Sequence, residues 1–414
     1  MTSLWEHADF MKLWAGQTVS QFGSMVTRDA LPMIGVLVLR ASPLQMGLLS
    51  AAGSAPVLLL GLLAGAWVDR LHRRPILIAA DLGRAILVAS IPAAVLFGRL
   101  TLPHLYLVAA LAGSLSVFFD VAYAAFLPVL VAREHVFEGN SKLSLTASLA
   151  EIVVPGLTGL LVQIISAPLT LFVDAVSFLG SALSVGLIRA PEPPPPPRLA
   201  GSLTREIGQG LRVTLANPVL RALALATAAR DFFGSFFGAL YSLYVLRVLG
   251  LQPVVLGLLI AGGGLGALAG AALARPFTRR LGLGPALSTA VLLMGLFGLL
   301  IPLAGGPPWL VILCMLLPQL FGDLFRAIFE ISALSLRQTL TPNHLLGRVS
   351  ASMNFIIGGV TTAGLLAGGL LGSLIGVRFA IWVAVLGGLA ATLLLVFSSV
   401  RTLREQPSVS TEER

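Results

Sequence analysis

The sequence has little of what a water-soluble protein needs at its surface. Charged residues make up 11% of the 414 positions and hydrophobic residues 57%, whereas soluble domains average about 25% charged residues. Cys314 is the single cysteine, which excludes an intramolecular disulfide, a cysteine-ligated zinc site and paired-thiol chemistry. We therefore expect lipid, rather than water, to surround most of this chain.

Other absences narrow the function. The Gly-x-x-x-x-Gly-Lys-Ser/Thr loop that cradles nucleotide phosphates does not occur, so ATP is not the expected energy source. Four of the five histidines lie outside the long apolar segments, and the fifth, His104, lies at the very start of one, which argues against an intramembrane enzyme, a metal site or a cofactor. The net charge of +9 is spread over short connections, so nucleic acid is not an expected partner. No cleaved signal peptide is expected either.

Twelve apolar segments are long enough to cross a bilayer as helices, because roughly 20 apolar residues span about 30 Å of hydrocarbon. Charge clusters and Pro/Gly turns separate them. The expected spans are 14–39, 44–68, 75–97, 102–132, 142–166, 168–189, 219–248, 252–275, 283–304, 308–335, 348–374 and 377–400. These spans predict an all-α, multi-pass protein of the inner (plasma) membrane.

The basic residues give the expected orientation. Most of the 27 Lys and Arg residues fall on alternate connections, which the positive-inside rule assigns to the cytoplasm. The connections of the opposite side carry Arg40, Arg99, Arg247 and Arg378. We therefore expect an even number of spans, with both termini cytoplasmic.

A polar stretch divides the spans into two groups of six. The prolines from Pro191 to Pro197 cannot continue a helix, and 202–215 has the apolar spacing of a short amphipathic helix at the membrane surface. The expected domains are a six-helix bundle at 1–189, a cytoplasmic linker at 190–217, a second six-helix bundle at 218–400 and a cytoplasmic tail at 401–414. A Leu-Ala-Gly-Ala stretch precedes an Arg pair in both bundles, either as an internal repeat or by chance.

The connection after the second span reads Gly65-Ala-Trp-Val-Asp69-Arg70-Leu-His-Arg73-Arg74-Pro75. It resembles the signature between the second and third helices of the major facilitator superfamily. Segments 14–23, 81–84, 174–178 and 336–350 narrow the resemblance to the twelve-span drug:proton antiporter branch, which includes macrolide and enterobactin exporters. The resemblance implies the major facilitator fold, with two pseudo-symmetric six-helix bundles, and we expect a monomer.

Two features depart from that branch. The fifth span retains only part of the antiporter motif, in Val154-Pro-Gly-Leu-Thr-Gly159. The fourth span carries Asp120 but lacks the arginine that is common in proton-coupled relatives. Proton antiport therefore stays open at this point.

The signature motif predicts an inner gate at Asp69, Arg70 and Arg73. A carboxylate at position 69 would face the positive end of the eleventh helix, a contact worth roughly 0.3–1 kcal/mol when exposed. The two arginines would add ion pairs. The alternative is that these residues only fix the topology.

Acidic residues occur where they are costly, near the middle of predicted spans. A charge there costs roughly 2.5–3.5 kcal/mol, so it normally faces a cavity or a partner. These residues are Asp29, Asp120, Asp231 and Asp323 on spans one, four, seven and ten, and Glu151 on span five. The resemblance implies that spans one, four, seven and ten line a central cavity.

Asp120 and Glu151 have no basic residue within four positions, which makes them the leading candidates for proton carriers, followed by Asp29 and Asp231. Arg28 and Arg230 adjoin the latter two, but neighbours on a helix diverge by about 100°, so we expect them to point elsewhere. Helical spacing predicts ion pairs among Asp323, Arg326 and Glu330, and between Asp81 and Arg84. A satisfied internal hydrogen bond is the alternative for each acid.

Aromatic side chains cluster on spans four, seven and ten. Beside the acids they would form an apolar, acidic pocket for an amphipathic molecule, cationic ones included, although helix packing is the alternative for each ring. The candidate cavity residues are Gln21, Arg28, Phe119, Tyr123, Phe233, Phe237, Tyr241, Asp323 and Arg326.

Together these patterns predict a secondary active transporter rather than an enzyme. It would export an amphipathic small molecule, such as a drug, a macrolide-like or a siderophore-like compound, by proton antiport with alternating access. Its partners would be that substrate, protons and membrane lipids. The alternatives are a lipid or lysolipid flippase, an uptake symporter, an intramembrane enzyme, and a receptor that uses a transporter fold without transport.

Overall fold

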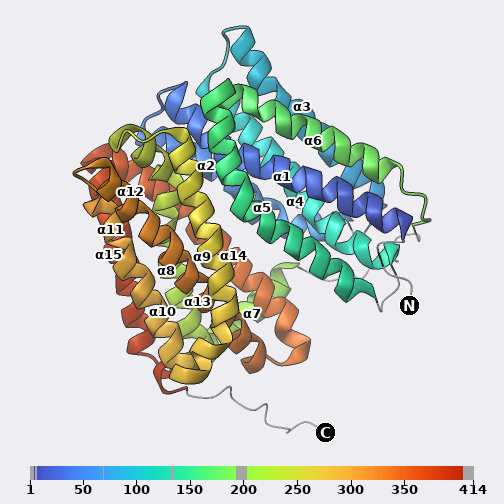
Figure 1. Cartoon of the computed structure of the whole chain (residues 1–414). Helices are drawn as coiled ribbons and strands as arrows, with labels where there is room; N and C mark the ends of the chain where they lie inside the picture. The colour runs from blue at the N-terminus through green and yellow to red at the C-terminus, as the bar shows by residue number, and fades with distance from the viewer. Residues whose placement is uncertain (1–3, 5–6, 69, 132–134, 193–202, 404–414) are drawn as a thin grey trace. The chain divides into compact units, whose positions relative to one another are not determined.

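The computed structural model describes residues 4, 7–68, 70–131, 135–192 and 203–403, with side chains omitted at 62, 66 and 203–207. All regular structure in this part of the chain is helical (Figure 1). The chain forms two compact units. The first comprises Met1–Leu199 and Val245–Ala261, and the second comprises Ala200–Tyr244 and Gly262–Arg414.

The first unit is built from six long helices. Prolines in the first turns of α2, α4 and α6 favour helix starts there, because proline fixes φ near the helical value and lacks the N–H that would stay unbonded. The helices are α1 (Ala8–Leu37), α2 (Pro43–Val68), α3 (Arg73–Leu96), α4 (Leu102–Leu130), α5 (Val136–Ile165) and α6 (Ala167–Gly186).

The second unit contains the remaining helices and two π-helical turns. In sequence order the elements are α7 (Leu203–Ala216), α8 (Pro218–Leu243), η3 (Tyr244–Val248), α9 (Pro253–Leu281), α10 (Leu283–Gly298), α11 (Leu300–Leu303), α12 (Pro308–Leu317), η4 (Pro318–Gly322), α13 (Asp323–Leu340), η5 (Asn343–Leu345), α14 (Leu346–Ile375), α15 (Val377–Val396) and η6 (Ser399–Thr402). The boundary between the two units falls within η3 and again within α9. The residues between these two points, Val245–Ala261, therefore belong to the first unit. The linker helix α7 packs against α14, where a side chain at Gly210 would overlap the Arg348 carbonyl.

The last two long helices of each half repeat one another in length and in their connection. Helices α5 and α14 have 30 residues each, and α6 and α15 have 20 each. A single residue joins each pair: Ser166 with φ 100° and ψ 154°, and Gly376 with φ 87° and ψ 152°. Glycine adopts such a positive φ without strain, whereas serine does not. The matching geometry supports an internal structural repeat.

In the described part of the chain, ten helical stretches are long and apolar enough to cross a membrane. They correspond to every predicted span except the first and the seventh. Helices α1 and α8 cover those two predictions with 30 and 26 residues, but each carries an Arg-Asp pair and several other polar residues. The count of twelve spans and the cytoplasmic termini therefore stay predictions.

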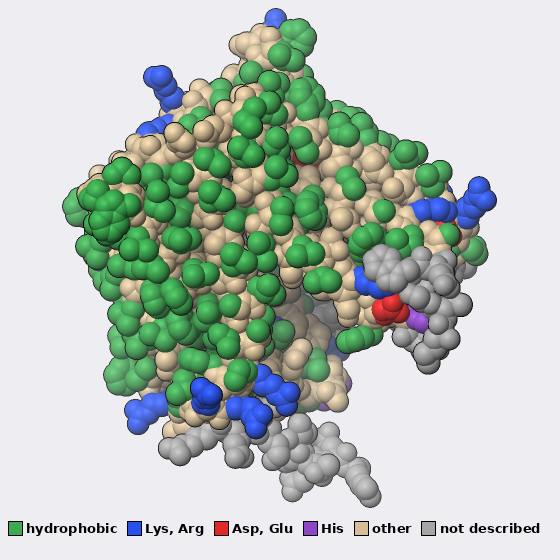
Figure 2. All heavy atoms as spheres, viewed as in Figure 1, with side chains coloured by type: hydrophobic (Ala, Val, Ile, Leu, Met, Phe, Trp, Pro, Cys, Tyr) green, Lys and Arg blue, Asp and Glu red, His purple; other side chains and the backbone are tan. Residues whose placement is uncertain are grey.

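Apolar side chains cover much of the outer surface. Figure 2 shows them spread over the visible face, with Lys and Arg side chains gathered at its margins. Ile86, Val176 and Leu374 are 72%, 65% and 71% exposed, which would be unfavourable in water but suits contact with lipid chains. The surface agrees with a protein embedded in a bilayer.

The segment Val245–Ala261 packs tightly within the first unit. Arg247, in η3, donates from Nη1 to the Ala41 carbonyl at 2.9 Å and from Nη2 to the Val36 carbonyl at 2.8 Å, so it caps the end of α1. A side chain at Gly159 on α5 would overlap the Pro253 carbonyl at the start of α9. Small residues permit this close approach of the two helices.

Candidate functional site

A cavity of about 480 Å³ opens within the first unit, between α1, α3, α4 and α5. Its lining is polar for a membrane helix bundle. It is formed by Gln17, Ser20, Gln21, Ser24, Met25, Arg28, Arg84, Ser116, Phe119, Asp120, Tyr123 and Glu151. The cavity thus brings together two of the four predicted proton carriers and all four predicted substrate-cavity residues of this half.

Arg28 is at the centre of an ion-pair cluster in this cavity. Its Nη1 lies 2.9 Å from Glu151 Oε1 and its Nη2 lies 3.2 Å from Oε2, a two-bond contact between α1 and α5. Its Nε lies 3.2 Å from Asp29 Oδ1. The expectation that Arg28 points away from Asp29 is wrong, because the long arginine side chain turns back along the helix to reach its neighbour.

Glu151 therefore has a cation that its own helix does not supply. The absence of a basic residue within four positions made it a leading proton-carrier candidate, but the partner comes from α1. Proton binding at Glu151 would weaken a two-bond contact with a charged donor, at a cost that solvent reduces because both side chains are about half exposed. The role of Glu151 as a proton carrier stays a prediction.

Asp120 has a different environment in the same cavity. Its side chain is exposed to the cavity, and within the described ranges it makes no ion pair or hydrogen bond. The nearby Arg84 is already bound, since its Nη2 lies 2.5 Å from Asp81 Oδ1, as the i, i+3 spacing predicts. Arg84 also lies between the rings of Phe119 and Phe178, at 4.2 and 4.4 Å from their centres.

A second cavity, of about 540 Å³, lies within the second unit between α8, α10, η4, α13, α14 and α15. Phe237, Tyr241, Asp323 and Arg326, all predicted cavity residues, contribute to its lining, as does Asp231. Gln319 Nε2 donates to Tyr241 Oη at 2.8 Å across the cavity wall. Gln319 belongs to the π-helical turn η4, and such turns are frequent at functional sites.

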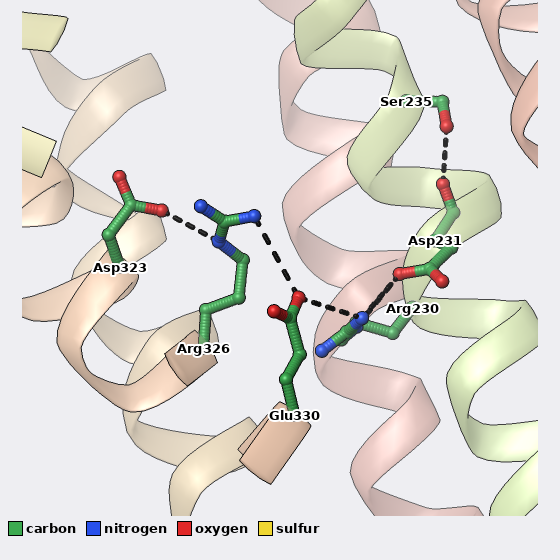
Figure 3. Close-up of polar contacts among 6 residues, drawn as sticks. All are labelled: Arg230, Asp231, Ser235, Asp323, Arg326 and Glu330. Carbon is green, nitrogen blue, oxygen red and sulfur yellow. Dashed lines mark hydrogen bonds and ion pairs between the residues drawn. The ribbon is translucent and has the colours of Figure 1, made fainter. Parts of the chain in front are cut away.

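Five charged side chains form a connected row along this cavity, which we call the charged ladder (Figure 3). Arg326 joins Asp323 at 2.8 Å and Glu330 at 3.8 Å on α13. Glu330 lies 3.5 Å from Arg230 on α8, and Arg230 lies 2.6 Å from Asp231. The pairs on α13 confirm the prediction from spacing.

The ladder also corrects one expectation. Arg230 was expected to point away from Asp231, yet it donates to Asp231 Oδ1 from both Nε and Nη2, at 2.9 and 2.6 Å. The same reach of an arginine side chain accounts for this pair and for the one on α1. Arg230 is thus the link between α8 and α13, a role that helical spacing alone does not reveal.

The other predicted residues have different positions. Phe233 is not among the lining residues of either cavity in the described part of the chain. It packs against Phe232 and Phe236, with ring centres 5.2 and 5.9 Å apart, and its ring occupies the space that a side chain at Gly387 would need. Its periodic spacing therefore reflects helix packing.

The predicted gate residues are only partly described. Asp69 lies outside the described residues, and Arg70 is exposed in a turn. Arg73 lies 3.5 Å from Glu192, which also accepts hydrogen bonds from the backbone N–H groups of Arg73 and Arg74 at 2.6 and 3.2 Å. Glu192 therefore caps the N-terminus of α3, where a negative charge is favoured. The gating role stays a prediction.

Comparisons with known proteins agree with this architecture. The family model of transmembrane secretion effectors, from the major facilitator group, matches residues 3–413. The multidrug efflux pump Tap of Mycolicibacterium fortuitum is 30% identical over 369 residues, covering 86% of this chain and 87% of the pump. The enterobactin exporter EntS of Escherichia coli O127:H6 is 26% identical, covering 95% and 88%.

A solved structure shows the same fold. A bacterial homologue of the iron transporter ferroportin superposes with a TM-score of 0.75 at 20% identity, covering 95% of this chain and 99% of the other. With ten apolar helices, the chain is a multi-pass protein of the inner membrane. It belongs to the transmembrane secretion effector family of major facilitator superfamily transporters.

Proposed function

We propose that this chain is a secondary active transporter that exports an amphipathic small molecule in exchange for protons. The observation that carries the proposal is Asp120, a carboxylate that is exposed to an intramembrane cavity and has no cation paired with it among the described residues. A charge at such a depth is costly unless it has a function or a partner. In our proposal Asp120 takes up and releases the coupled proton, while Arg28 keeps Glu151 and Asp29 bound to itself.

The proton can bind at Asp120 without disrupting an existing ion pair. At Glu151, Asp29 and Asp231 it would neutralise one acid of an existing ion pair with Arg28 or Arg230, and breaking a fully buried pair costs about 3–5 kcal/mol. Each arginine keeps a second acid, so the cost at these positions is below that value. Arg28 and Glu151 are roughly half exposed, so their cost is smaller, but the order of preference is the same. Asp120 is therefore the first of the four candidates.

The second-unit cavity supports an amphipathic substrate. Its volume of about 540 Å³ falls within the range of about 300–1,000 Å³ that is usual for sites of drug-sized ligands. Phe237, Tyr241 and Ile301 line one part of it, and the charged ladder lines another. Multidrug efflux by Tap and enterobactin export by EntS suggest a drug-like or siderophore-like compound, moved by alternating access of the two halves.

Transport in reconstituted liposomes tests the proposal. Liposomes containing wild type, Asp120→Asn or Glu138→Gln would enclose a pH-sensitive dye and receive erythromycin, enterobactin or lysophosphatidylcholine under an imposed pH gradient. Glu138 is a matched control, since it is an exposed acid on α5 paired with Lys142. We expect substrate-dependent proton movement in wild type and Glu138→Gln, and its loss in Asp120→Asn, with substrate counterflow retained.

Two results would reject this assignment. Proton movement in Asp120→Asn equal to that in wild type would exclude Asp120 as the proton carrier. Movement of lysophosphatidylcholine alone, at a rate independent of the pH gradient, would instead favour the lipid flippase.

A further inference from the structure

A smaller chamber, of about 230 Å³, lies next to the large cavity of the second unit, between α8, α13 and α14. The two spaces share Arg230, Asp231 and Glu330 in their linings, so the ion pair between Arg230 and Glu330 stands at their common wall. The small chamber is also lined by Arg337 and Thr227. Neither residue belongs to the charged ladder.

Two arginine N–H groups at this chamber lack an acceptor among the residues that the structure describes. Arg337 is half-buried, and its Nε is buried without a hydrogen-bond partner in the described structure. Arg230 is 7% exposed; its Nε and Nη2 bind acids of the ladder, but its Nη1 is buried without a partner in the same part of the chain. A buried donor without an acceptor is unfavourable, and more so when it carries charge.

The charges around the chamber indicate what would satisfy these donors. The carboxylates of Asp231 and Glu330 are both bound to Arg230, and Glu330 is also close to Arg326. Within the described ranges Arg337 has no acid partner, so the chamber holds one arginine whose charge is not paired. Arginine presents planar N–H groups that match a carboxylate in geometry.

The walls and the volume restrict the ligand further. Leu223, Phe329 and Met353 give the chamber apolar sides, which suit a hydrocarbon or aromatic group. The chamber is smaller than the usual site of a drug-sized molecule, about 300–1,000 Å³. It therefore fits a small acid, or the acidic end of a larger one.

We propose that this chamber is a carboxylate-binding site, in which Arg337 Nε and Arg230 Nη1 hold the acidic group of an amphipathic organic acid. Binding of a carboxylate in this chamber does not depend on the proposed transport function. Only the conclusion that such acids are transported rests on that function. It extends the substrate class from amphipathic molecules in general to those with a carboxylate. Because Arg230 serves both spaces, the bound acid would compete with Glu330 for the same guanidinium group.

Equilibrium binding tests the site without requiring transport. Benzoate and its neutral isostere benzamide would be titrated calorimetrically into the full-length protein in lipid nanodiscs. The variants are Arg337→Gln and, as a matched control, Arg280→Gln, which removes an exposed arginine that lines neither space. Melting temperatures of both variants would establish that each is folded.

We expect benzoate to bind the wild type and Arg280→Gln equally, and Arg337→Gln about tenfold or more weakly, since one charged hydrogen bond is lost. Benzamide should not bind measurably. Absence of saturable benzoate binding to the wild type, equal affinity in Arg337→Gln and Arg280→Gln, or equal affinity for benzamide would each overturn the proposal.

The same assay separates this site from the transport proposal. Asp120 lies in the first unit, whereas this chamber belongs to the second. The Asp120→Asn variant should therefore bind benzoate with wild-type affinity. If Asp120→Asn keeps full proton coupling in liposomes while benzoate binding still depends on Arg337, the transport assignment fails and the carboxylate site stands. If proton coupling depends on Asp120 but benzoate binding is unchanged in Arg337→Gln, the carboxylate site fails and the transport assignment stands.

Discussion

The buried pair of Asp81 and Arg84 should be the most sensitive charged contact of the first unit. The two side chains are 0% and 5% exposed and 2.5 Å apart. Replacing Asp81 by Asn keeps the shape but removes the negative charge, which leaves the buried guanidinium group without the carboxylate bound directly to it. Such a loss costs about 3–5 kcal/mol. The contacts of the Arg84 guanidinium group with the rings of Phe119 and Phe178 remain in the variant. Each stabilises the charge by about 0.5–2 kcal/mol, so we expect a loss of unfolding free energy of about 3 kcal/mol, the lower end of that range.

The free energy of unfolding in detergent micelles, measured by denaturant titration with tryptophan fluorescence, would test this value. Glu138→Gln removes an acid that is 41% exposed from an i, i+4 pair with Lys142 and should cost much less, because solvent screens such a pair. The double variant Asp81→Asn with Arg84→Gln should be more stable than Asp81→Asn alone, since the stranded charge is gone. A cost below about 1 kcal/mol for Asp81→Asn, or simple additivity in the double variant, would refute the argument.

Two further predictions concern other parts of the first unit. Gly159→Ala places a β-carbon against the Pro253 carbonyl and should lower the free energy of unfolding by about 1–3 kcal/mol through overpacking. Gly180→Ala, whose β-carbon would meet open space, is the control and should be neutral or stabilising. Equal melting temperatures for the two variants would contradict this reasoning. At the start of α1, the hydrogen bond from Lys12 holds the pKa of Asp9 below its usual value of 3.8. Its stabilising effect is therefore present above that pH and is lost as the pH falls through the lower pKa of the folded state. Melting temperatures of wild type and Asp9→Asn should differ at about pH 7 and converge once the pH falls below the lowered pKa of Asp9, and a difference that does not shrink in acid would exclude this assignment.

Helix positions and the locations of the acids follow well from sequence. The apolar segments predicted α2 to α6 and α14 to α15 closely, because lipid requires long apolar runs that end at charges or prolines. Spacing along one helix also predicted the contacts of Asp81 with Arg84 and of Asp323 with Arg326. These features depend on residues near one another in the chain.

Partners between helices could not be predicted in this way. Glu151 forms an ion pair with Arg28 on α1, and Glu330 forms one with Arg230 on α8. These pairings depend on which helices pack together. The angle between neighbours on a helix misled the prediction for Arg28 and Arg230, since it describes the backbone and ignores the reach of four side-chain torsions. The π-helical turn at Gln319 likewise has no sequence signature. The same holds for the N–H groups of Arg337 and Arg230 that have no acceptor within the described ranges.

The position of Val245–Ala261 has a practical consequence for dissecting this protein. A gene cut in the linker would yield a first polypeptide that lacks this segment, although the segment completes its own compact unit. The carbonyls of Val36 and Ala41 would lose the guanidinium group of Arg247, and the glycine face of α5 would lose the start of α9. The two gene halves therefore do not encode two self-sufficient folding units, and a first fragment expressed alone should be poorly stable until the second is supplied.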